Sequence, residues 1–337
     1  MLSDELKKQI QLAYRASLDA KSHKPRAGQR QMIGAIARTL GNIKQGSEGE
    51  RLDEKHVAVI EAGTGTGKTL SYCLATIPIA KARGLKLVIS TATVALQEQI
   101  LHKELPDLLE HTELNFKYTL AKGRGRYLCL NNLEGFLGAE ERAIDDMFAG
   151  LFEQHLQSDD VNTVLYQEMD AALEKGDWDG DKDNWAGIIR DQDWRRLMTD
   201  HQQCTNRNCA NYSACPFFKA RAEIEVADVI VANHDLVLAD LSLGGGAILS
   251  APKETIYVFD EGHHLPDKAI GHFRHEVRLQ QSIAWLRQLE KNLVNLKQEL
   301  TDDVSLTGQL LLKIPQQIQS IVNFIQYAQQ GLAPYIQ

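Results

Sequence analysis

The sequence predicts an α/β fold in which a parallel sheet is covered by helices on both faces. Short apolar runs rich in β-branched residues alternate with helical patterns over residues 56–111 and again over 228–275. A Gly-rich turn joins the first apolar run to the helix that follows it. Because strands that alternate with helices pair in parallel, these observations favour a single sheet domain. The alternation stops between about 112 and 222, and there we expect an insertion.

The elements follow in chain order. Strands are expected at 56–62 ("HVAVIEA"), 85–91 ("LKLVIST"), 228–234 ("DVIVANH") and from residue 255 ("TIYVFDEGHH"). Helical patterns cover 67–82 and 92–105, after the first and the second of these strands. Beyond about residue 276 the chain has long helical patterns with almost no strand signal. The expected domains are therefore a sheet domain (1–111 and 223–275), an insertion (112–222) and a helical region (276–337).

The composition is that of a globular protein from a reducing compartment. The chain has 337 residues, of which 43% are apolar and 24% charged, so it can bury a sizeable core. No apolar run reaches the ~18 residues of a transmembrane helix, and residues 1–18 form an amphipathic pattern without a cleavage site. The five cysteines are odd in number, and no export signal precedes them. We therefore expect a cytoplasmic protein with no membrane partner, whose clustered cysteines bind metal rather than form disulfides.

The net charge of −8 is unevenly distributed along the chain. Residues 140–203 hold 17 acidic and 6 basic residues, which we interpret as a solvated surface segment. Residues 117–129 ("KYTLAKGRGRYLC") contain Lys122, Arg124 and Arg126 beside two tyrosines and have no acidic residue. Cations interleaved with aromatic residues suit the phosphates and stacked bases of a single strand. On its own this is a weak signal, because short basic loops are common.

The stretch "EAGTGTGKT" (61–69) predicts a phosphate-binding P-loop. It fits the pattern G-x-x-x-x-G-K-[ST] except that Ala62 replaces the first glycine, and an expected strand and helix flank it. In such a loop, backbone N–H groups and the helix N-terminus surround the β- and γ-phosphates of ATP, while the lysine adds a positive charge and the threonine binds Mg²⁺. The expected nucleotide-binding residues are Gly63, Thr64, Gly65, Thr66, Gly67, Lys68 and Thr69, with Thr69 also as the Mg²⁺ ligand.

An acidic pair follows the last expected strand, in "IYVFDEGHH" (256–264). An Asp at the end of a buried strand can bind the Mg²⁺ beside a P-loop, so Asp260 is the expected metal and nucleotide ligand. The adjacent Glu261 can orient and deprotonate the attacking water. Lys68, Asp260 and Glu261 are therefore the candidate catalytic residues for ATP hydrolysis. His263 or His264 would either relay between nucleotide and nucleic acid or be a plain surface histidine.

Four cysteines form a candidate metal site: Cys129, Cys204, Cys209 and Cys215. Their spacing is C-x₇₄-C-x₄-C-x₅-C. Structural zinc usually pairs its cysteines as C-x₂₋₄-C on both sides, and only one pair here comes close to that pattern. Four thiolates also suit an iron–sulfur cluster, so the spacing leaves both metals open. Cys73 lies in the expected helix after the P-loop and fits a buried core position instead.

Several segments together resemble the XPD-like group of DNA helicases. They are "PRAGQRQM" (25–32), "EAGTGTGKTLSY" (61–72), "VISTATVALQEQI" (88–100), "GRGRYLC" (123–129), "CTNRNCANYSACPFF" (204–218), "VANHDLVLAD" (231–240) and "VFDEGHHLPD" (258–267). The resemblance covers nearly the whole chain and is weakest after residue 276. It implies a RecA-like P-loop parallel-sheet domain with an inserted iron–sulfur cluster domain and, from residue 276, the start of a helical arch domain.

The resemblance also implies a chemistry and a set of partners. The four spaced cysteines would ligate a [4Fe–4S] cluster, and Gln29 would read the adenine of ATP. Thr91 would touch the DNA backbone, and the basic loop with Lys122, Arg124 and Arg126 would lie along the path of a single strand. The implied activity is Mg²⁺-dependent ATP hydrolysis that drives 5′-to-3′ translocation on single-stranded DNA. We expect a monomer that acts on forked or tailed duplexes in DNA repair.

The chain departs from that group in one respect. A second RecA-like domain, with its arginine finger and Q-x-x-G-R-x-x-R motif, is not found in these 337 residues. We therefore expect a truncated helicase that binds ATP and single-stranded DNA but unwinds little. The alternative is a non-motor protein, either an ATP- and DNA-binding module or a redox-sensing iron–sulfur protein with little turnover. DNA-stimulated ATP hydrolysis distinguishes the two.

Overall fold

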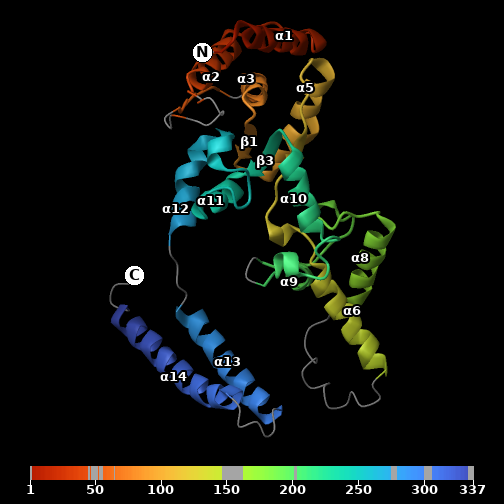
Figure 1. The fold of residues 1–337 in the computed structure, drawn as a ribbon, viewed down its shortest axis with the longest axis vertical. Helices are drawn as coiled ribbons and strands as arrows, with labels where there is room; N and C mark the ends of the chain where they lie inside the picture. Colours follow the sequence, from red (N-terminus) through yellow and green to blue (C-terminus); the bar gives the residue numbers. More distant parts are fainter. Residues whose placement is uncertain are drawn as a thin grey trace. The chain divides into compact units, whose positions relative to one another are not determined.

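The computed structural model describes residues 2–44, 46, 52, 56–63, 65–145, 162–200, 203–274, 279–299 and 306–332. The chain forms two compact units, Met1–His272 and Phe273–Gln337. The first unit contains a sheet with its covering helices and a smaller body of helices and loops (Figure 1). The second unit is a pair of helices.

The first unit is built on a four-stranded sheet in which all strand pairs are parallel. The strands are β1 (Lys86–Thr91), β2 (Tyr118–Leu120), β3 (Val229–Asn233) and β4 (Thr255–Phe259), in the spatial order β2-β3-β1-β4. The strands expected at 85–91, at 228–234 and from residue 255 are confirmed, and so is the parallel α/β fold. Because the strands run the same way, the residues that follow β1, β3 and β4 gather at one edge, where a ligand site is expected.

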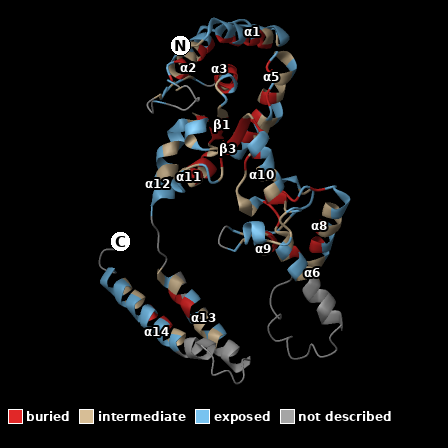
Figure 2. Cartoon of the chain, viewed as in Figure 1, coloured by how far each residue is buried: buried red, intermediate tan, exposed pale blue. Residues whose placement is uncertain are grey.

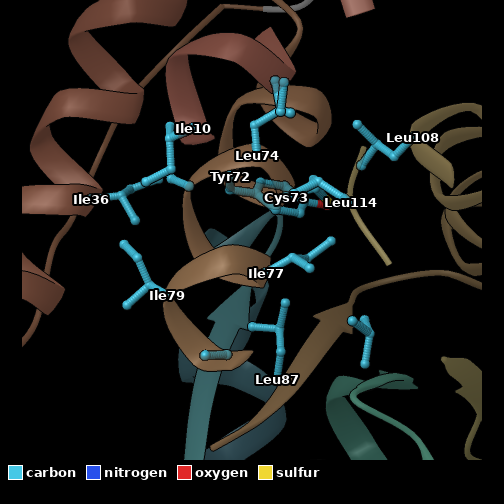
Figure 3. Packing of buried hydrophobic residues seen from close by; sticks show 14 of the residues in the cluster. Ile10, Ile36, Tyr72, Cys73, Leu74, Ile77, Ile79, Leu87, Leu108 and Leu114 are labelled. Atoms are coloured by element: carbon cyan, nitrogen blue, oxygen red, sulfur yellow. The ribbon is translucent and has the colours of Figure 1, made fainter. Parts of the chain in front are cut away.

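Side chains alternate between the two faces of the sheet, and helices cover both faces. Leu87 and Ile89 of β1 belong to a core that includes buried residues of α1 (Asp4–Ala20), α2 (Ala27–Gly41) and α3 (Lys68–Ala82), as Figure 3 shows. Val88 of β1 belongs to a second core with residues of α10 (Pro216–Val226) and α11 (His234–Ser242). Cys73 lies in the first core with no exposed surface, as its position in the sequence predicts, and burial raises the pKa of its thiol.

The helix expected at 92–105 is three consecutive helical segments. α4 (Val94–Gln99) continues through a π-helical turn (Ile100–Glu104) into α5 (Leu105–His111). Leu105 and Leu108 are buried in the core beside α3, so the apolar positions of this segment determine which side packs inward. The last helix of the first unit, α12 (Leu265–Phe273), follows β4 and has no buried residue.

The strand expected at 56–62 is wrong. Residues 56–63 form no strand, and Val57 and Val59 are 83% and 94% exposed. An apolar, β-branched run favours a strand only where a neighbouring strand pairs with it and buries it. Residues 56–63 have no such partner among the described strands, since β4 pairs with β1 alone.

Conversely, β2 was not expected, because three residues give no periodic pattern. It lies within the 112–222 segment and pairs with β3, so the sheet extends into that segment.

The body between β2 and β3 has a hydrophobic core of its own. Its helices are α6 (Leu130–Asp145), α8 (Thr163–Lys175) and α9 (Asp191–Leu197). Its core residues are Leu128, Leu133, Leu165, Tyr166, Met169, Trp178, Trp194 and Leu197. The described part of the acidic segment is not a uniformly solvated surface, which corrects the sequence interpretation: Asp181 and Asp193 are 6% and 1% exposed. The carboxylate of Asp193 accepts a hydrogen bond from Arg190 at 2.8 Å, because a buried charge needs a partner.

The second unit consists of α13 (Leu279–Glu299) and α14 (Leu306–Leu332). Its core contains Ile283 and Leu286 of α13 and Ile318 and Val322 of α14. These positions recur every three or four residues, so each helix turns one apolar face to the other. Figure 2 shows buried residues along the described part of α13. The all-helical character expected after residue 276 is confirmed for the described residues.

Candidate functional site

The P-loop turn leads directly into α3, and its backbone allows a close approach. Gly67 adopts the left-handed conformation (φ 77°) just before the helix begins. A Cβ at Gly67 would lie 2.2 Å from Nε2 of Gln29 and would sit on a left-handed backbone, so this position favours glycine. Gln29 is buried, and its Oε1 accepts a hydrogen bond from the Tyr14 hydroxyl at 3.0 Å. Because the Arg26 guanidinium also donates to the Gly65 carbonyl, the segment expected to read the adenine lies against the P-loop.

The other described residues of the loop shape the same turn. The Thr66 hydroxyl donates to the Gly63 carbonyl at 2.8 Å. Thr69, the expected Mg²⁺ ligand, is in the first turn of α3, where its side chain interacts with the Tyr72 hydroxyl. Thr64 lies outside the described residues.

Two candidate catalytic residues from distant parts of the chain are in direct contact. Nζ of Lys68 lies 3.0 Å from Oε1 of Glu261, and the two side chains are 27% and 31% exposed. The hydrogen bond from Lys68 lowers the pKa of Glu261, and the charge of Lys68 and of the nearby histidines adds to this effect. Nδ1 of His263 lies 3.3 Å from the other carboxylate oxygen. Glu261 also has a positive φ of 53°, which is uncommon for a residue with a Cβ and indicates a constrained turn.

Asp260 is held in place by three hydrogen bonds. Its N–H donates to the Ser90 carbonyl at 2.8 Å, its Oδ1 accepts from the Glu261 N–H at 3.0 Å, and its Oδ2 accepts from the Tyr72 hydroxyl at 3.2 Å. Burial raises the pKa of Tyr72 well above its ordinary value, so its phenol stays protonated and can donate. The sequence analysis missed Tyr72. Its spacing of four residues from Lys68 puts both on one face of α3 and could have identified it.

A buried histidine connects β1 to this turn. His234 begins α11 with no exposed surface, and its Nδ1 lies 2.7 Å from Oγ of Ser90. Its Nε2 has no hydrogen-bond partner among the described residues. Burial lowers the pKa of His234, and the backbone of Glu261 and Asp260 opposes this shift. Ser90 therefore contacts Asp260 through its carbonyl and His234 through its hydroxyl, an arrangement that the sequence analysis did not find.

The four spaced cysteines line a single cavity. Cys129 precedes α6 and Cys215 precedes α10, so two of the thiols are at helix N-termini. Cys204 and Cys209 flank the short turn between them, and Sγ of Cys204 accepts a hydrogen bond from the Asn206 N–H at 3.4 Å. The cavity wall is otherwise mostly apolar, aromatic or amide in character and contains no Asp, Glu or His among the described residues.

The four thiols are neighbours in this cavity. Burial raises the pKa of Cys129, and the proximity of Cys215 and Cys204 adds to this effect. Within the described residues, no group of three or more His, Cys, Asp or Glu side chains is arranged to hold a metal ion. The four cysteines therefore share one cavity, and the metal site expected of them stays a prediction.

The basic loop is engaged with the acidic segment. Nζ of Lys122 lies 2.5 Å from Asp181 and 2.9 Å from Asp183, and only 14% of the Lys122 side chain is exposed. Arg126 pairs with Asp183 as well. Arg124 lies over the Phe217 ring, with the guanidinium carbon 4.1 Å from the centroid. Acidic and aromatic side chains thus contact all three of these cations, and the DNA contact expected of them stays a prediction.

Thr91 is at the end of β1 beside the nucleotide site. It is fully buried, and its hydroxyl donates to the Thr93 carbonyl at 3.1 Å. The exposed residue of this turn is Thr93, whose hydroxyl accepts from the Leu96 N–H and caps α4. The structure therefore brings Gln29, Lys68, Asp260 and Glu261 together and leaves Thr91 behind the surface of that site.

Comparison with protein families matches residues 43–224 to the family described as DEAD/DEAH box helicase and residues 192–282 to one described as DEAD_2. The chain is similar to proteins named "ATP-dependent DNA helicase DinG". It is 45% identical to that of Salmonella typhimurium, 44% to that of Escherichia coli and 40% to that of Photobacterium profundum, each over 269 residues or 80% of this chain. The chain spans only 36–37% of the length of these relatives.

A solved structure titled "XPD_Helicase" matches with a TM-score of 0.40 at 14% identity, over 91% of this chain and 52% of that one. Within the described residues, no helix combines the length and the apolar character needed to cross a bilayer.

Proposed function

The chain belongs to the DEAD/DEAH box helicase family, and on this basis we propose that it carries the ATP-hydrolysing site of a DNA helicase that moves 5′ to 3′ on single-stranded DNA. The observation that carries this proposal is the contact of Lys68 with Glu261 beside the buried Asp260, across 193 residues of sequence. The names of the relatives, ATP-dependent DNA helicases at 40–45% identity, support the same activity.

The chemistry of hydrolysis follows from these three residues. Lys68 would bind the β- and γ-phosphates and stabilise the charge that develops on them. Asp260 and Thr69 would hold Mg²⁺, which would neutralise part of the phosphate charge. The carboxylate of Glu261 would orient the attacking water and accept its proton, a role that suits a group kept ionised by its surroundings. Gln29 would recognise the adenine from its position against the P-loop.

The cysteine cavity supports a [4Fe–4S] cluster held by Cys129, Cys204, Cys209 and Cys215. Such a cluster supplies a rigid cross-link and, where its potential allows, an electron-transfer centre. The protein residues around it would order the segment between β2 and β3: the backbone N–H of Cys129 donates to the Leu197 carbonyl, and Cys215 begins α10, which leads back to the sheet. The observation that supports this assignment is the four-thiol donor set with no competing carboxylate in its wall.

The proposed organisation follows from these assignments. Residues 1–111 and 223–275 would form the ATP-binding motor domain, 112–222 the cluster domain and 276–337 the start of an arch domain. Single-stranded DNA and forked or tailed duplexes would be the substrates of a cytoplasmic, monomeric enzyme.

The test is Mg²⁺-dependent ATP hydrolysis by the 337-residue chain, measured with and without single-stranded DNA. We expect turnover that DNA stimulates and that Lys68→Ala removes. A protein that binds ATP with no DNA-stimulated turnover would instead favour the non-motor module. Hydrolysis that persists in Lys68→Ala would contradict the assignment of the site itself.

A further inference from the structure

A groove runs between α1 and α2 on the surface of the first unit. Residues at every third or fourth position of α1 from Lys7 to Leu18, and of α2 from Arg30 to Gly41, line a cavity of about 870 Å³. This spacing puts each set along one face of its helix. The volume lies within the range of protein ligand sites, roughly 300–1,000 Å³.

The floor of the groove is apolar. Ile10, Leu18 and Ile33 line it and are at most 9% exposed, because their side chains also reach into the core. On the α2 side, Gly34 and Ala37 carry almost no side chain and leave the floor uncovered. The groove is therefore a preformed apolar surface that small residues keep open.

The rim of the groove carries unpaired cations. Arg15, Arg30 and Arg38 line the cavity and are exposed, and their guanidinium groups form no ion pair or hydrogen bond with the described residues. Lys7 adds a fourth cation, which is bonded to Asp4 at 2.8 Å. Among the described residues that line the groove there is no Asp or Glu. In a chain with a net charge of −8, this region combines an apolar floor with a positive rim.

The groove is poorly suited to a single DNA strand. Sequence-tolerant binding of single strands uses exposed aromatic rings on which bases stack. Tyr14 is the one aromatic residue lining the groove; it is 8% exposed, and its hydroxyl is bonded to Gln29. Hydrated phosphates would leave the apolar floor in contact with water, so no free energy would be gained. Apolar side chains of a peptide would remove this floor from water and so stabilise the complex.

We propose that this groove is a docking site for an amphipathic acidic helix of another protein. Its apolar face would lie over Ile10 and Ile33, and its Asp and Glu side chains would pair with Arg15, Arg30 and Arg38. In helix-in-groove recognition the apolar anchors of the bound helix recur at three- and four-residue spacing, so they form one row that can lie over the apolar floor between α1 and α2. The interaction goes beyond ATP hydrolysis and requires neither nucleotide nor DNA.

The probe is a fluorescein-labelled synthetic peptide of about twenty residues with Leu along one helical face and Glu on both sides of it. Its binding to the 337-residue chain is followed by fluorescence anisotropy without nucleotide. We expect saturable binding that Arg15→Glu, Arg30→Glu and Arg38→Glu each weaken by about tenfold or more, because like charges then face each other. Ala37→Leu, which fills the groove without changing charge, should weaken binding to a similar degree. Lys8→Glu is the matched control, because Lys8 is an exposed lysine of α1 outside the groove, and it should change affinity by less than about twofold.

Three results would overturn the proposal. One is equal binding of a peptide with the same composition in shuffled order, since only the amphipathic arrangement should fit. Another is an equal loss of affinity in Lys8→Glu, which would indicate diffuse attraction by charge. The third is full retention of binding in Ala37→Leu with unchanged thermal stability. Competition by single-stranded DNA that releases the peptide from wild type, together with loss of that DNA affinity in Arg38→Glu, would assign the groove to nucleic acid instead.

Discussion

The ammonium group of Lys68 lies 3.0 Å from a carboxylate oxygen of Glu261. The lysine expected to bind phosphate is thus paired with the carboxylate expected to activate water. A nucleotide must break this pair, because its phosphates need Lys68 and its attacking water needs Glu261. Both side chains are partly exposed, so the exchange does not require the site to unfold.

Glu261→Gln should separate binding from hydrolysis. The amide cannot accept the proton of the attacking water, so the rate should fall by about 10²–10⁴. ATP affinity should hold or rise a few-fold, because the negative charge of Glu261 no longer competes with the phosphates for Lys68. Equilibrium binding of a fluorescent ATP analogue and single-turnover hydrolysis measure the two effects. Weaker ATP binding in this variant would contradict the role of the pair.

Lys68→Ala should lose tight ATP binding. The phosphates would lose the one lysine that the P-loop turn presents, and Glu261 would be left without its cation. The same binding assay measures the change. Lys81→Ala is the control, because Lys81 is also a lysine of α3 and forms an ion pair with Asp228. Unchanged Mg·ATP affinity in Lys68→Ala would show that the P-loop is misassigned.

Tyr72→Phe should weaken Mg²⁺ binding while leaving the fold intact. The ring keeps its volume, but Oδ2 of Asp260 loses its donor. Groups that orient a metal ligand are typically worth about 10–100-fold in metal affinity, so the Mg²⁺ concentration for half-maximal hydrolysis should rise by that order. Tyr118→Phe, in β2, is the control. If the two variants titrate alike with Mg²⁺, Tyr72 has no positioning role.

Cys204→Ser should lose the metal that the cavity holds. Protein purified without oxygen should be brown and contain about four irons per chain, the count that the proposed [4Fe–4S] cluster implies. The variant should lose the colour and become more sensitive to proteolysis between β2 and β3, because metal binding and folding are coupled. Cys73→Ser should keep the iron, since Cys73 lies in the core of the sheet domain. Stoichiometric zinc in place of iron would refute the cluster assignment.

His234 should make the protein less stable in mild acid. Its pKa is lowered in the folded state, while an unfolded histidine titrates near ~6.5. At a pH between the folded-state and unfolded-state pKa values, the unfolded chain binds a proton that folded His234 does not. The free energy of unfolding therefore falls as the pH drops below ~6.5. Above ~6.5, His234 does not change the free energy of unfolding. The slope is at most about 1.4 kcal/mol per pH unit.

Urea denaturation at about pH 7.5 and about pH 5.5 measures this effect. His234→Asn removes the titrating ring, and its amide can still bond to Ser90, so the difference between the two pH values should shrink. His23→Asn, at an exposed histidine, should leave the difference unchanged. An unaltered pH dependence in His234→Asn would show that His234 titrates normally.

Much of the site could be predicted because its chemistry requires particular residues at particular places. Lys68 must begin a helix after a glycine turn, and Asp260 must follow a buried strand, and both patterns are local in sequence. The contacts that support them are not local. Tyr72 and Ser90 are ordinary helix and strand residues. The pairing of β1 with β4 brings Ser90 to Asp260, and the packing of α3 against β4 brings Tyr72 to it.

The basic loop illustrates the opposite limit. Lys122 and Arg126 have no acidic residue near them in the sequence, which favoured a nucleic-acid contact. The fold brings Asp181 and Asp183 to them from about sixty residues away. Charge patterning along a chain therefore predicts a charged surface only where no distant segment folds back onto it. The failed strand at 56–62 has a similar cause, since strand formation depends on a partner that the segment itself does not encode.

The strand order β2-β3-β1-β4 has a consequence for how the protein is made. β1 is complete at Thr91, yet both of its neighbours are synthesised after residue 228. During translation β1 therefore has no paired strand on either edge until the residues between β2 and β3 have been synthesised. Loop-closure entropy grows only slowly with length, by about 0.6 kcal/mol per doubling, so a long separation is tolerable at equilibrium but exposes the nascent chain to aggregation. Early compaction of the residues between β2 and β3, including assembly of their cysteine cavity, would bring β3 near β1 and shorten that interval.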